Sequence, residues 1–329
     1  MVQLKDIGEH ELLKIINQYC DRTKTGDDGA IVSVEPPQQL IVTTDVLVEN
    51  NHFSDRTTPP KSIGYRAMTA NLSDIAAMGG MAVGVTVGLS LRSDVEVSWL
   101  EEVYQGMVAC LAPHNVAIIG GDITRSQTNT IAITALGAVA PPEIIYRHQA
   151  QIGDAIIITG KHGLSRAGLE ILLHPDEYKD VDETIKEKLI YHHQYPLPRL
   201  DVIKRLREIS TEIRVGGMDS SDGLADAILQ ICEQSNVGAK LDLGVIAPAD
   251  EIKAIVDEQT AINWLFYGGE DFELVLCLPL VIAEELKLQL PEEIQIIGQI
   301  VADKNVIAID PNNDDRQFLL NKKKTFQHF

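Results

Sequence analysis

The chain has 329 residues, of which 28 are Lys or Arg and 48 are Asp or Glu, so its formal net charge at pH 7 is −20. Its length suits two domains, and its composition, 45% hydrophobic and 23% charged, is that of a folded globular protein rather than a disordered chain. The surplus acid repels polyphosphate backbones and anionic lipid heads, which argues against a nucleic-acid or membrane partner. A phosphorylated substrate would therefore require cations.

The cysteines lie far apart and form no C-x-x-C pair, which argues against a zinc site or a secreted disulfide framework. They are Cys20, Cys110, Cys232 and Cys277. The first eleven residues contain no continuous apolar segment of the kind that directs export. We therefore expect a cytoplasmic protein with reduced, mostly buried thiols.

The first half of the chain predicts alternating helices and strands. Apolar residues at helical spacing predict helices over 8–20, 61–78 and 95–112. Alternating and β-branched runs predict strands over 30–34, 39–44, 83–89, 116–119 and 130–139. The uncharged run 75–91 has marginal length for a membrane helix, and its alternating valines favour a buried strand instead.

Pro141-Pro142 interrupts this alternation, and a new strand is predicted from residue 155. We therefore assign residues 1–145 to an N-terminal α/β domain and 146–329 to a C-terminal α/β domain. The second domain has predicted helices over 165–173, 182–192, 200–209 and 224–235. Its predicted strands cover 155–159, 240–243, 272–278 and 294–300.

Many acidic residues stand at short elements punctuated by glycine, which we predict to be turns beside strands. These elements are Gly26-Asp27-Asp28-Gly29, Thr43-Thr44-Asp45, Asn71-Leu72-Ser73-Asp74, Gly120-Gly121-Asp122, Asp219-Ser220-Ser221-Asp222-Gly223 and Gly268-Gly269-Glu270-Asp271. Any one of them is most simply a turn or a helix cap, because Asp and Gly are common there. Together they favour hard divalent cations such as Mg²⁺, which bridge protein carboxylates to substrate phosphates. The pattern alone predicts a multi-metal, phosphate-handling enzyme.

Other nucleotide and metal signatures are absent from the sequence. It contains no G-x-x-x-x-G-K-[ST] loop, no protein-kinase H-R-D and D-F-G pair and no H-E-x-x-H helix. Any nucleotide chemistry must therefore use a different phosphate-binding arrangement.

Taken in order, the acidic elements resemble the thiamine-monophosphate kinases, a family of the aminoimidazole ribonucleotide synthetase superfamily. The resemblance spans nearly the whole chain. It rests on TTDVLVE (43–49), NLSDIAAMG (71–79), GGDITR (120–125), SDGL (221–224) and GGEDFEL (268–274).

The resemblance implies an α/β (α+β) chain with the two-domain aminoimidazole ribonucleotide synthetase-like fold. In that fold the N-terminal sheets of two subunits form a dimeric barrel, so a homodimer is expected. The N-terminal domain is expected to serve dimerisation and to bind metal and nucleotide. The C-terminal domain is expected to complete the active site. The implied reaction transfers the γ-phosphoryl group of ATP, the co-substrate, to thiamine monophosphate, with several Mg²⁺ ions. The attacking phosphate oxygen, with a second pKa of about 6, is largely deprotonated at neutral pH, so we assign no general base and expect direct in-line transfer.

The resemblance also implies roles for individual residues. The implied metal ligands are Asp27, Asp28, Thr43, Thr44, Asp45, Asp74, Asp122, Asp219 and Asp222, where either member of the Asp27-Asp28 pair could carry the role. The implied nucleotide contacts are Tyr104, Gly121, Asp122, Arg147 and Ser221. The implied substrate contacts are His52, Glu270 and Phe326.

The residues themselves leave alternatives open for the substrate contacts. A lone histidine such as His52 more often has a structural role. Glu270 could belong to a metal-linked network instead of contacting the heterocycle. Phe326 could only dock the tail, although an aromatic face also suits a cationic thiazolium. Trp264 and Phe266 are predicted to be core residues.

The residues are also compatible with two rival functions. One is another activity of the same superfamily, such as a selenophosphate synthetase, a hydrogenase-maturation dehydratase or an aminoimidazole ribonucleotide synthetase. The other is a metal-dependent nucleotide-binding protein without turnover. An assay with ATP, Mg²⁺ and thiamine monophosphate separates all of them.

Overall fold

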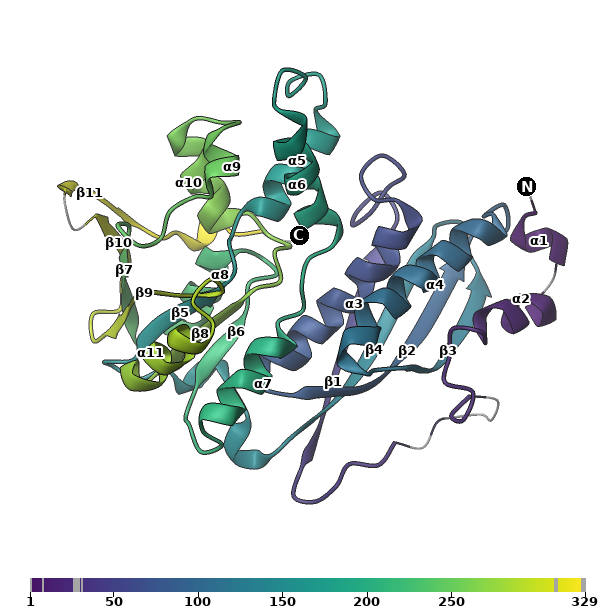
Figure 1. The fold of residues 1–329 in the computed structure, drawn as a ribbon, viewed down its shortest axis with the longest axis horizontal. Coiled ribbons are helices and arrows are strands. Elements are labelled where there is room, and N and C mark those ends of the chain that lie inside the picture. The colour runs from purple at the N-terminus through teal and green to yellow at the C-terminus, as the bar shows by residue number, and fades with distance from the viewer. Residues whose placement is uncertain (1, 8, 26–29, 31, 311–312, 327–329) are drawn as a thin grey trace. The chain divides into compact units, whose positions relative to one another are not determined.

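The computed structural model describes residues 2–7, 9–25, 30, 32–310 and 313–326. The chain divides into two compact units. Unit 1 consists of Met1–Ile75 and Met81–Val139, and unit 2 consists of Ala76–Gly80 and Ala140–Phe329. Each unit is built around its own β-sheet, as Figure 1 shows.

Unit 1 is organised around a four-stranded sheet in the order β1-β4-β2-β3. In chain order its elements are α1 (Leu4–Ile7), α2 (Glu9–Ile16), β1 (Gln39–Val48), α3 (Pro60–Ala77), β2 (Met81–Leu91), α4 (Val97–Leu111), η1 (Ala112–His114), β3 (Ile118–Arg125) and β4 (Thr130–Val139). β4 runs antiparallel to both β1 and β2, and β3 runs parallel to β2. Within the single chain this sheet is open, so the barrel shared by two subunits stays a prediction.

The long helices α3 and α4 lie together on one face of this sheet (Figure 1). They approach so closely that a Cβ atom on Gly64 would lie 1.8 Å from the carbonyl oxygen of Val103. On the other face β1 exposes large apolar side chains, with Leu40, Val42 and Val46 at 49%, 58% and 48% exposure. The alternation of a strand therefore gives β1 one helix-covered face and one open apolar face.

Unit 2 contains a seven-stranded sheet in the order β11-β10-β7-β9-β5-β8-β6. Its strands are β5 (Ala155–Thr159), β6 (Gly216–Asp219), β7 (Gly238–Asp242), β8 (Leu274–Leu278), β9 (Ile294–Val301), β10 (Val306–Asp310) and β11 (Asn313–Leu319). Its helices are η2 (Pro141–Glu143), η3 (Arg147–Gln149), α5 (Leu164–Leu173), α6 (Glu183–Gln194), α7 (Leu200–Ile209), α8 (Leu224–Ser235), α9 (Asp250–Lys253), α10 (Glu258–Tyr267), α11 (Leu280–Gln289) and η4 (Lys322–Lys324).

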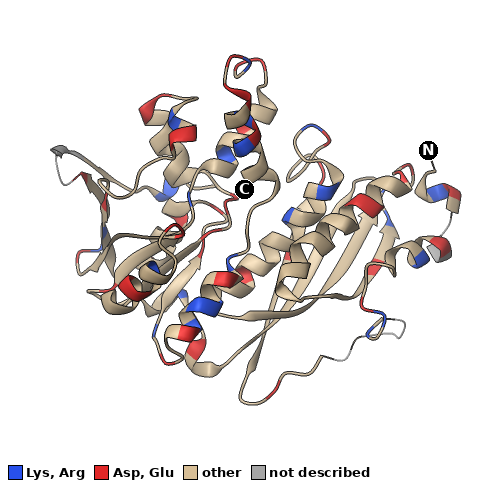
Figure 2. Cartoon of the chain, in the orientation of Figure 1, with Lys and Arg blue, Asp and Glu red and all other residues tan. Residues whose placement is uncertain are grey.

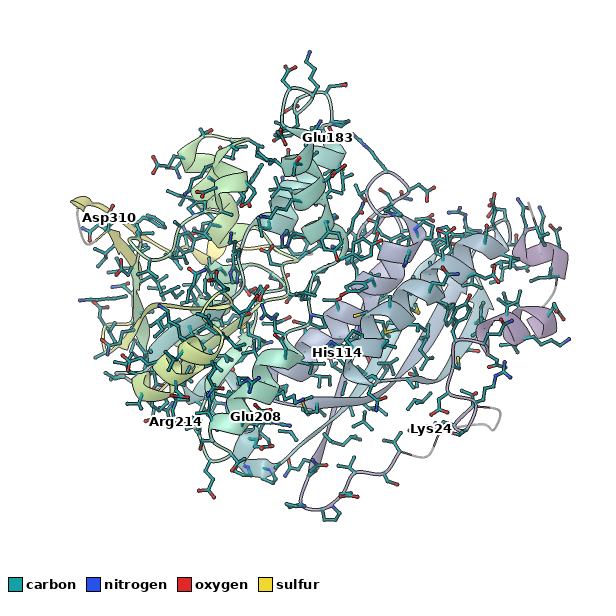
Figure 3. The ribbon with its side chains drawn as sticks, in the orientation of Figure 1. Lys24, His114, Glu183, Glu208, Arg214 and Asp310 are labelled. Atoms are coloured by element: carbon teal, nitrogen blue, oxygen red, sulfur yellow. The ribbon has the colours of Figure 1, made fainter. Side chains whose placement is uncertain are left out.

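The central strands β5 and β8 are buried along their whole length. α8 packs on β6, β7, β8 and β10, whereas α11 packs on β5 and β9. The main core of unit 2 joins α8 to the sheet and includes the predicted core residue Phe266, which is fully buried. A bidentate ion pair between Arg214, labelled in Figure 3, and Asp154 ties the segment before β6 to the start of β5.

Several predicted elements are confirmed, and others are wrong. In the segment expected to form a strand over 30–34, the described residues 30 and 32–34 are irregular. The helix expected over 8–20 is shorter. Two of the acidic elements predicted as turns lie inside strands, Thr43-Thr44-Asp45 in β1 and Gly120-Gly121-Asp122 in β3. Asn71–Asp74 lies in α3, which confirms the helix predicted over 61–78 and not a turn. The four cysteines are free thiols, and Cys110, Cys232 and Cys277 are buried, as expected.

Among the residues that the structure describes, no helix combines the length and the apolar character needed to cross a membrane.

Candidate functional site

In unit 1 the predicted metal ligands Thr43, Asp45 and Asp74 lie together. Thr43 and Asp45 are two residues apart in β1, so their side chains project from the same face of the sheet, the face covered by α3. The Thr43 hydroxyl donates a hydrogen bond to Asp74 Oδ2 in α3. The main-chain N–H of Asp45 donates to Asn71 Oδ1 at 3.2 Å, one helical turn before Asp74. A strand and a helix thus bring two carboxylates and a hydroxyl into one cluster.

The electrostatics of this cluster fit a cation. Burial, together with the neighbouring Asp74 carboxylate, raises the pKa of Asp45 to about 6. Asp45 Oδ2 is buried and accepts no hydrogen bond within the described part of the chain. A buried carboxylate oxygen without a donor is costly unless something positive binds it. Hard oxygen ligands of this kind suit Mg²⁺, which often binds one or two protein carboxylates and takes its other ligands from water and phosphate.

Thr44 and Asp122 project from the other face of the same sheet. Thr44 Oγ1 lies 2.9 Å from Thr134 Oγ1 on β4. Asp122 on β3 is exposed and is aligned through the strand register with Val46, which also belongs to the open face. The predicted ligands of unit 1 are therefore divided between two faces, and the Thr44 hydroxyl does not share the Asp45 cluster.

Two other predicted contacts in unit 1 have distinct surroundings. His52 follows β1, and its Nδ1 accepts a hydrogen bond from the main-chain N–H of Val48 at 3.1 Å, so the neutral ring carries its proton on Nε2. Tyr104 lies in α4 at 3% exposure, and its ring stacks on Tyr19 with centroids 5.4 Å apart. Burial raises the pKa of Tyr104 above its usual value. Its nucleotide contact stays a prediction.

In unit 2 two motifs found by sequence pack directly against each other. One is the turn after β6 (219–223, the SDG turn), and the other is the loop before β8 (268–273, the GGED loop). The main-chain N–H of Glu270 donates to the Ser221 carbonyl at 2.7 Å, and that of Ser220 donates to the Glu273 carbonyl at 2.7 Å. A Cβ atom on Gly269 would lie 2.7 Å from the Ser221 carbonyl oxygen, so the close approach of the two segments requires glycine there.

The predicted site residues of unit 2 occupy these two segments. Asp219 ends β6 at 3% exposure, and its Oδ1 accepts a hydrogen bond from Ser221 Oγ at 3.2 Å. Asp222 follows in the turn, and Gly223 leads into α8. The structure therefore brings Asp219, Ser221, Asp222 and the Glu270 backbone into one neighbourhood.

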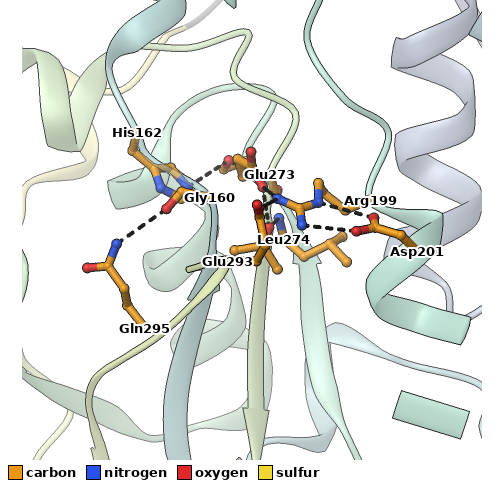
Figure 4. A network of polar contacts seen from close by, with 10 residues as sticks. Gly160, His162, Arg199, Asp201, Glu273, Leu274, Glu293 and Gln295 are labelled. Carbon is orange, nitrogen blue, oxygen red and sulfur yellow. Dashed lines mark hydrogen bonds and ion pairs between the residues drawn. The ribbon is translucent and has the colours of Figure 1, made fainter. Parts of the chain in front are cut away.

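A buried polar network around Glu273 and Arg199 holds the end of the GGED loop in place, as Figure 4 shows. Glu273 accepts hydrogen bonds from the Thr159 hydroxyl and from Arg199 Nη1, the latter at 3.0 Å. Arg199, at 2% exposure, also pairs with Asp201 and Glu293. Burial alone would lower the pKa of Arg199, but these carboxylates raise it above its usual value.

Asp271 and His162 complete this support. The Asp271 carboxylate accepts hydrogen bonds from the main-chain N–H groups of Gly163 and Ser165 at 2.6 and 2.8 Å. Burial raises the pKa of Asp271 to about 7, although both of these bonds lower it. His162 Nε2 lies 3.0 Å from Ser220 Oγ, and that hydroxyl donates to the Glu273 carbonyl at 3.1 Å.

Arg147 and Phe326 lie elsewhere in unit 2. Arg147 is exposed in η3, and its Nη1 donates to Gln230 Oε1 of α8 at 2.8 Å. Phe326 is 55% exposed. The segment before it packs beside the residue that precedes the GGED loop, because Asn321 N donates to Tyr267 Oη at 3.2 Å and Lys324 Nζ lies 5.6 Å from the Tyr267 ring centroid.

From the sequence, no individual role was assigned to the residues that hold the site segments in place. These are Asn71, Thr159, His162, Arg199, Asp271 and Glu273. Asp271 and Glu273 stand within GGEDFEL, directly before an apolar strand. Acidic side chains in that position indicate buried carboxylates that need hydrogen-bond or ion-pair partners. Asp27 and Asp28 lie outside the described residues. Within the described ranges no group of three or more His, Cys, Asp or Glu side chains is placed to hold one metal ion.

Most of the acid surplus lies away from these clusters. Figure 2 shows Asp and Glu on the helices and loops of both units. The charge relevant to a cation therefore comes from a few positioned carboxylates, not from the net charge.

Comparisons with known proteins agree with the two-unit architecture. Residues 26–139 match the family model of the AIR synthase related protein, N-terminal domain, and residues 151–310 match that of the C-terminal domain. The thiamine-monophosphate kinase of Synechococcus elongatus is 47% identical over 99% of this chain and 98% of its own length.

Two solved structures are also similar to the chain. The thiamine-monophosphate kinase from Stenotrophomonas maltophilia K279a has a TM-score of 0.78 at 27% identity, covering 91% of this chain and 94% of its own. The protein AaThiL complexed with AMPPCP and TMP has a TM-score of 0.76 at 28% identity, covering 100% and 99%.

Proposed function

The chain belongs to the AIR synthase related family, and from its similarity to the thiamine-monophosphate kinases we propose direct, Mg²⁺-dependent transfer of the ATP γ-phosphoryl group to thiamine monophosphate. The activity is ATP-dependent phosphorylation of thiamine monophosphate, giving thiamine diphosphate. The observation that carries it is 47% identity across nearly the full length of a thiamine-monophosphate kinase. A related structure, complexed with AMPPCP and TMP, supports this pair of substrates.

The carboxylate clusters account for how an acidic chain binds two anionic substrates. Asp45 and Asp74 in unit 1, and Asp219 and Asp222 in unit 2, would hold Mg²⁺, which supplies positive charge to the transferring phosphoryl group. The orphaned Asp45 Oδ2 supports this assignment. Asp27, Asp28, Thr43, Thr44 and Asp122 remain proposed ligands.

The chain needs no general base for this reaction. The attacking group is a phosphate oxygen whose second pKa of about 6 leaves it largely deprotonated at neutral pH. The task of the protein is therefore to position the substrates and to screen their charges.

Other side chains orient the two substrates in this proposal. His52 carries a proton on Nε2, so this N–H would donate a hydrogen bond to a phosphate oxygen. Glu270 would accept from the aminopyrimidine, and the exposed ring of Phe326 would stack on the cationic thiazolium. Tyr104, Gly121, Asp122, Arg147 and Ser221 are the proposed nucleotide contacts.

The proposal extends to domain roles and assembly. Residues 1–145 would bind metal and nucleotide and form a homodimer, and residues 146–329 would complete the active site. The open apolar face of β1 supports the homodimer, because an apolar sheet face of this kind is a typical subunit interface.

The metal assignment is tested by Asp45→Asn and Asp222→Asn in an assay of thiamine diphosphate formation over a range of Mg²⁺ concentrations. Each substitution removes a charged ligand, so we expect the Mg²⁺ concentration at half-maximal rate to rise at least tenfold. We also expect a smaller increase in melting temperature on adding Mg²⁺. Asp303→Asn, in an exposed turn of unit 2, is the matched control.

Two results would contradict the mechanism. If both variants keep the wild-type rate at limiting Mg²⁺, the metal assignment is wrong. A phosphorylated enzyme trapped from labelled ATP would instead contradict direct transfer. An inactive wild-type chain with thiamine monophosphate would overturn the function itself.

A further inference from the structure

The GGED loop holds two non-glycine residues in left-handed backbone conformations. Glu270 has φ 66° and Phe272 has φ 54°. Side chains with a Cβ atom rarely adopt this conformation, and they persist there only when the surrounding structure holds them. Asp271 stands between them, so its contacts decide how the loop is held.

Asp271 is bound at the first turn of α5, a helix of ten residues. Its two carboxylate oxygens each accept a separate main-chain N–H, from Gly163 and from Ser165. These N–H groups have no partner within the helix, and the helix dipole favours a negative charge beside them. The side chain is 6% exposed, so water does not compete for these bonds.

The placement of Asp271 is transmitted to both motifs of unit 2. The adjacent Glu270 N–H is bonded to the Ser221 carbonyl, and the Ser220 N–H is bonded to the Glu273 carbonyl. The position of the SDG turn therefore depends on the position of the GGED loop. The loop in turn is fixed to α5 through the Asp271 carboxylate.

We propose that Asp271 is a positioning residue for the kinase reaction: by capping α5 it holds Glu270 in the strained conformation that directs its side chain to the substrate heterocycle. This inference rests on the proposed function. Because both Asp271 oxygens bind the helix terminus, the proposed role is indirect and acts through Glu270.

The test replaces Asp271 with Asn and measures the KM of each substrate and kcat at pH 8. Asn has one acceptor oxygen in place of two, so one of the two N–H groups is left facing an amide that cannot accept from it. We expect the KM for thiamine monophosphate to rise about 10- to 100-fold, the range that misplacement of a contact produces. The KM for ATP should change less, because Ser221 keeps its own bond to Asp219.

Asp182→Asn is the matched control, because Asp182 caps α6 by accepting from Thr184 N and is exposed. Asp271→Glu is the second variant: it keeps the charge but adds one methylene, so it displaces the loop. We expect it to raise the same KM. A merely stabilising role would reduce the folded fraction and hence kcat while leaving both KM values unchanged.

The outcomes separate this inference from the function on which it rests. A folded Asp271 variant of either kind with a wild-type KM for thiamine monophosphate overturns the positioning role. Failure of the wild-type chain to convert thiamine monophosphate overturns the proposed function instead.

Discussion

His162 is a fully buried imidazole next to the GGED loop. Its Nε2 bonds to Ser220, and its Nδ1 has no hydrogen-bond partner among the described residues. Burial lowers the pKa of His162 to about 3, because the charged ring would lose its hydration. The ring is therefore neutral under all physiological conditions and acts as a fixed donor to Ser220.

His162 should make the protein less stable in mild acid. The folded state resists protonation down to about pH 3, whereas the unfolded chain takes up a proton below its ordinary pKa of 6.5, so stability is lost as pH falls below 6.5. At pH 5 this loss is about 2 kcal/mol. Urea unfolding at pH 8 and pH 5 should show His162→Asn less sensitive to acid than the wild type by that amount.

The exposed His148→Asn variant is the control for this prediction. Asp271, whose pKa is raised to about 7, acts in the opposite direction but contributes equally to both proteins, so it cancels in the difference. Equal pH dependence of the wild type and His162→Asn would show that the buried ring is protonated in the folded state.

At the scale of single residues the sequence located the motifs but not the direction of their side chains. Thr43, Thr44 and Asp45 were predicted to act together at the end of a strand. β1 continues to Val48, and its alternation sends Thr44 to the opposite face from its neighbours. The cluster of Asp45 with Asp74 depends on a contact between a strand and a helix 26 or more residues away, which local pattern does not specify.

At the scale of elements, Arg199 joins α7 to the sheet of unit 2. It precedes the first residue of α7 and binds Glu273 before β8, Glu293 before β9 and Asp201 within α7. Its guanidinium is almost completely buried. Removing Arg199 leaves the buried Glu273 carboxylate without its cation, which costs more than the pair contributes when intact.

Arg199→Met should therefore lower the free energy of unfolding by about 3 to 5 kcal/mol. Arg205→Met on the same helix is the control, since its exposed pair with Glu208 contributes about 1 kcal/mol or less. Chemical denaturation measures both. Adding Glu273→Gln to Arg199→Met should recover part of the loss, because it removes the buried unpaired charge. Similar losses in the two single variants would mean that the network is hydrated.

Strands with strong local patterns were predictable, as β5 and β4 show. Where the structure differs from the prediction, the secondary structure depends on whether the segment pairs with a strand distant in the sequence. Gly120-Gly121-Asp122 reads as a turn because of its glycines, yet it forms the middle of β3 through parallel pairing with β2. Val32 and Val34 are β-branched, but the described residues 32–34 pair with no strand, so propensity alone did not make a strand of them.

At the scale of the whole molecule, the acidic charge and the open sheet face of unit 1 have different roles. The carboxylates of Asp45 and Asp74 lie on the face covered by α3, while β1 exposes the apolar side chains of Leu40, Val42 and Val46 on the open face. A face of this kind buries its side chains only against another surface. A second copy of the chain is the proposed partner. The two-domain family fold follows from the sequence motifs alone, whereas the partner of this face does not.

The homodimer gives the last prediction: the wild-type chain should have twice its 36.2 kDa mass in solution, and Val42→Arg should shift it towards the monomer. Val42 is 58% exposed in the single chain, so Arg there is hydrated in the monomer but buried without a partner in the dimer. We expect the dissociation constant to rise at least 100-fold, or about 3 kcal/mol.

Leu288→Arg, at a 77% exposed position on α11, is the matched control and should leave the dimer intact. Light scattering coupled to size exclusion measures all three proteins. Because Leu288→Arg adds the same charge to the chain, a general effect of charge on assembly would appear in that control as well. A monomeric wild type, or equal dissociation of both variants, would place the subunit contact somewhere other than this face.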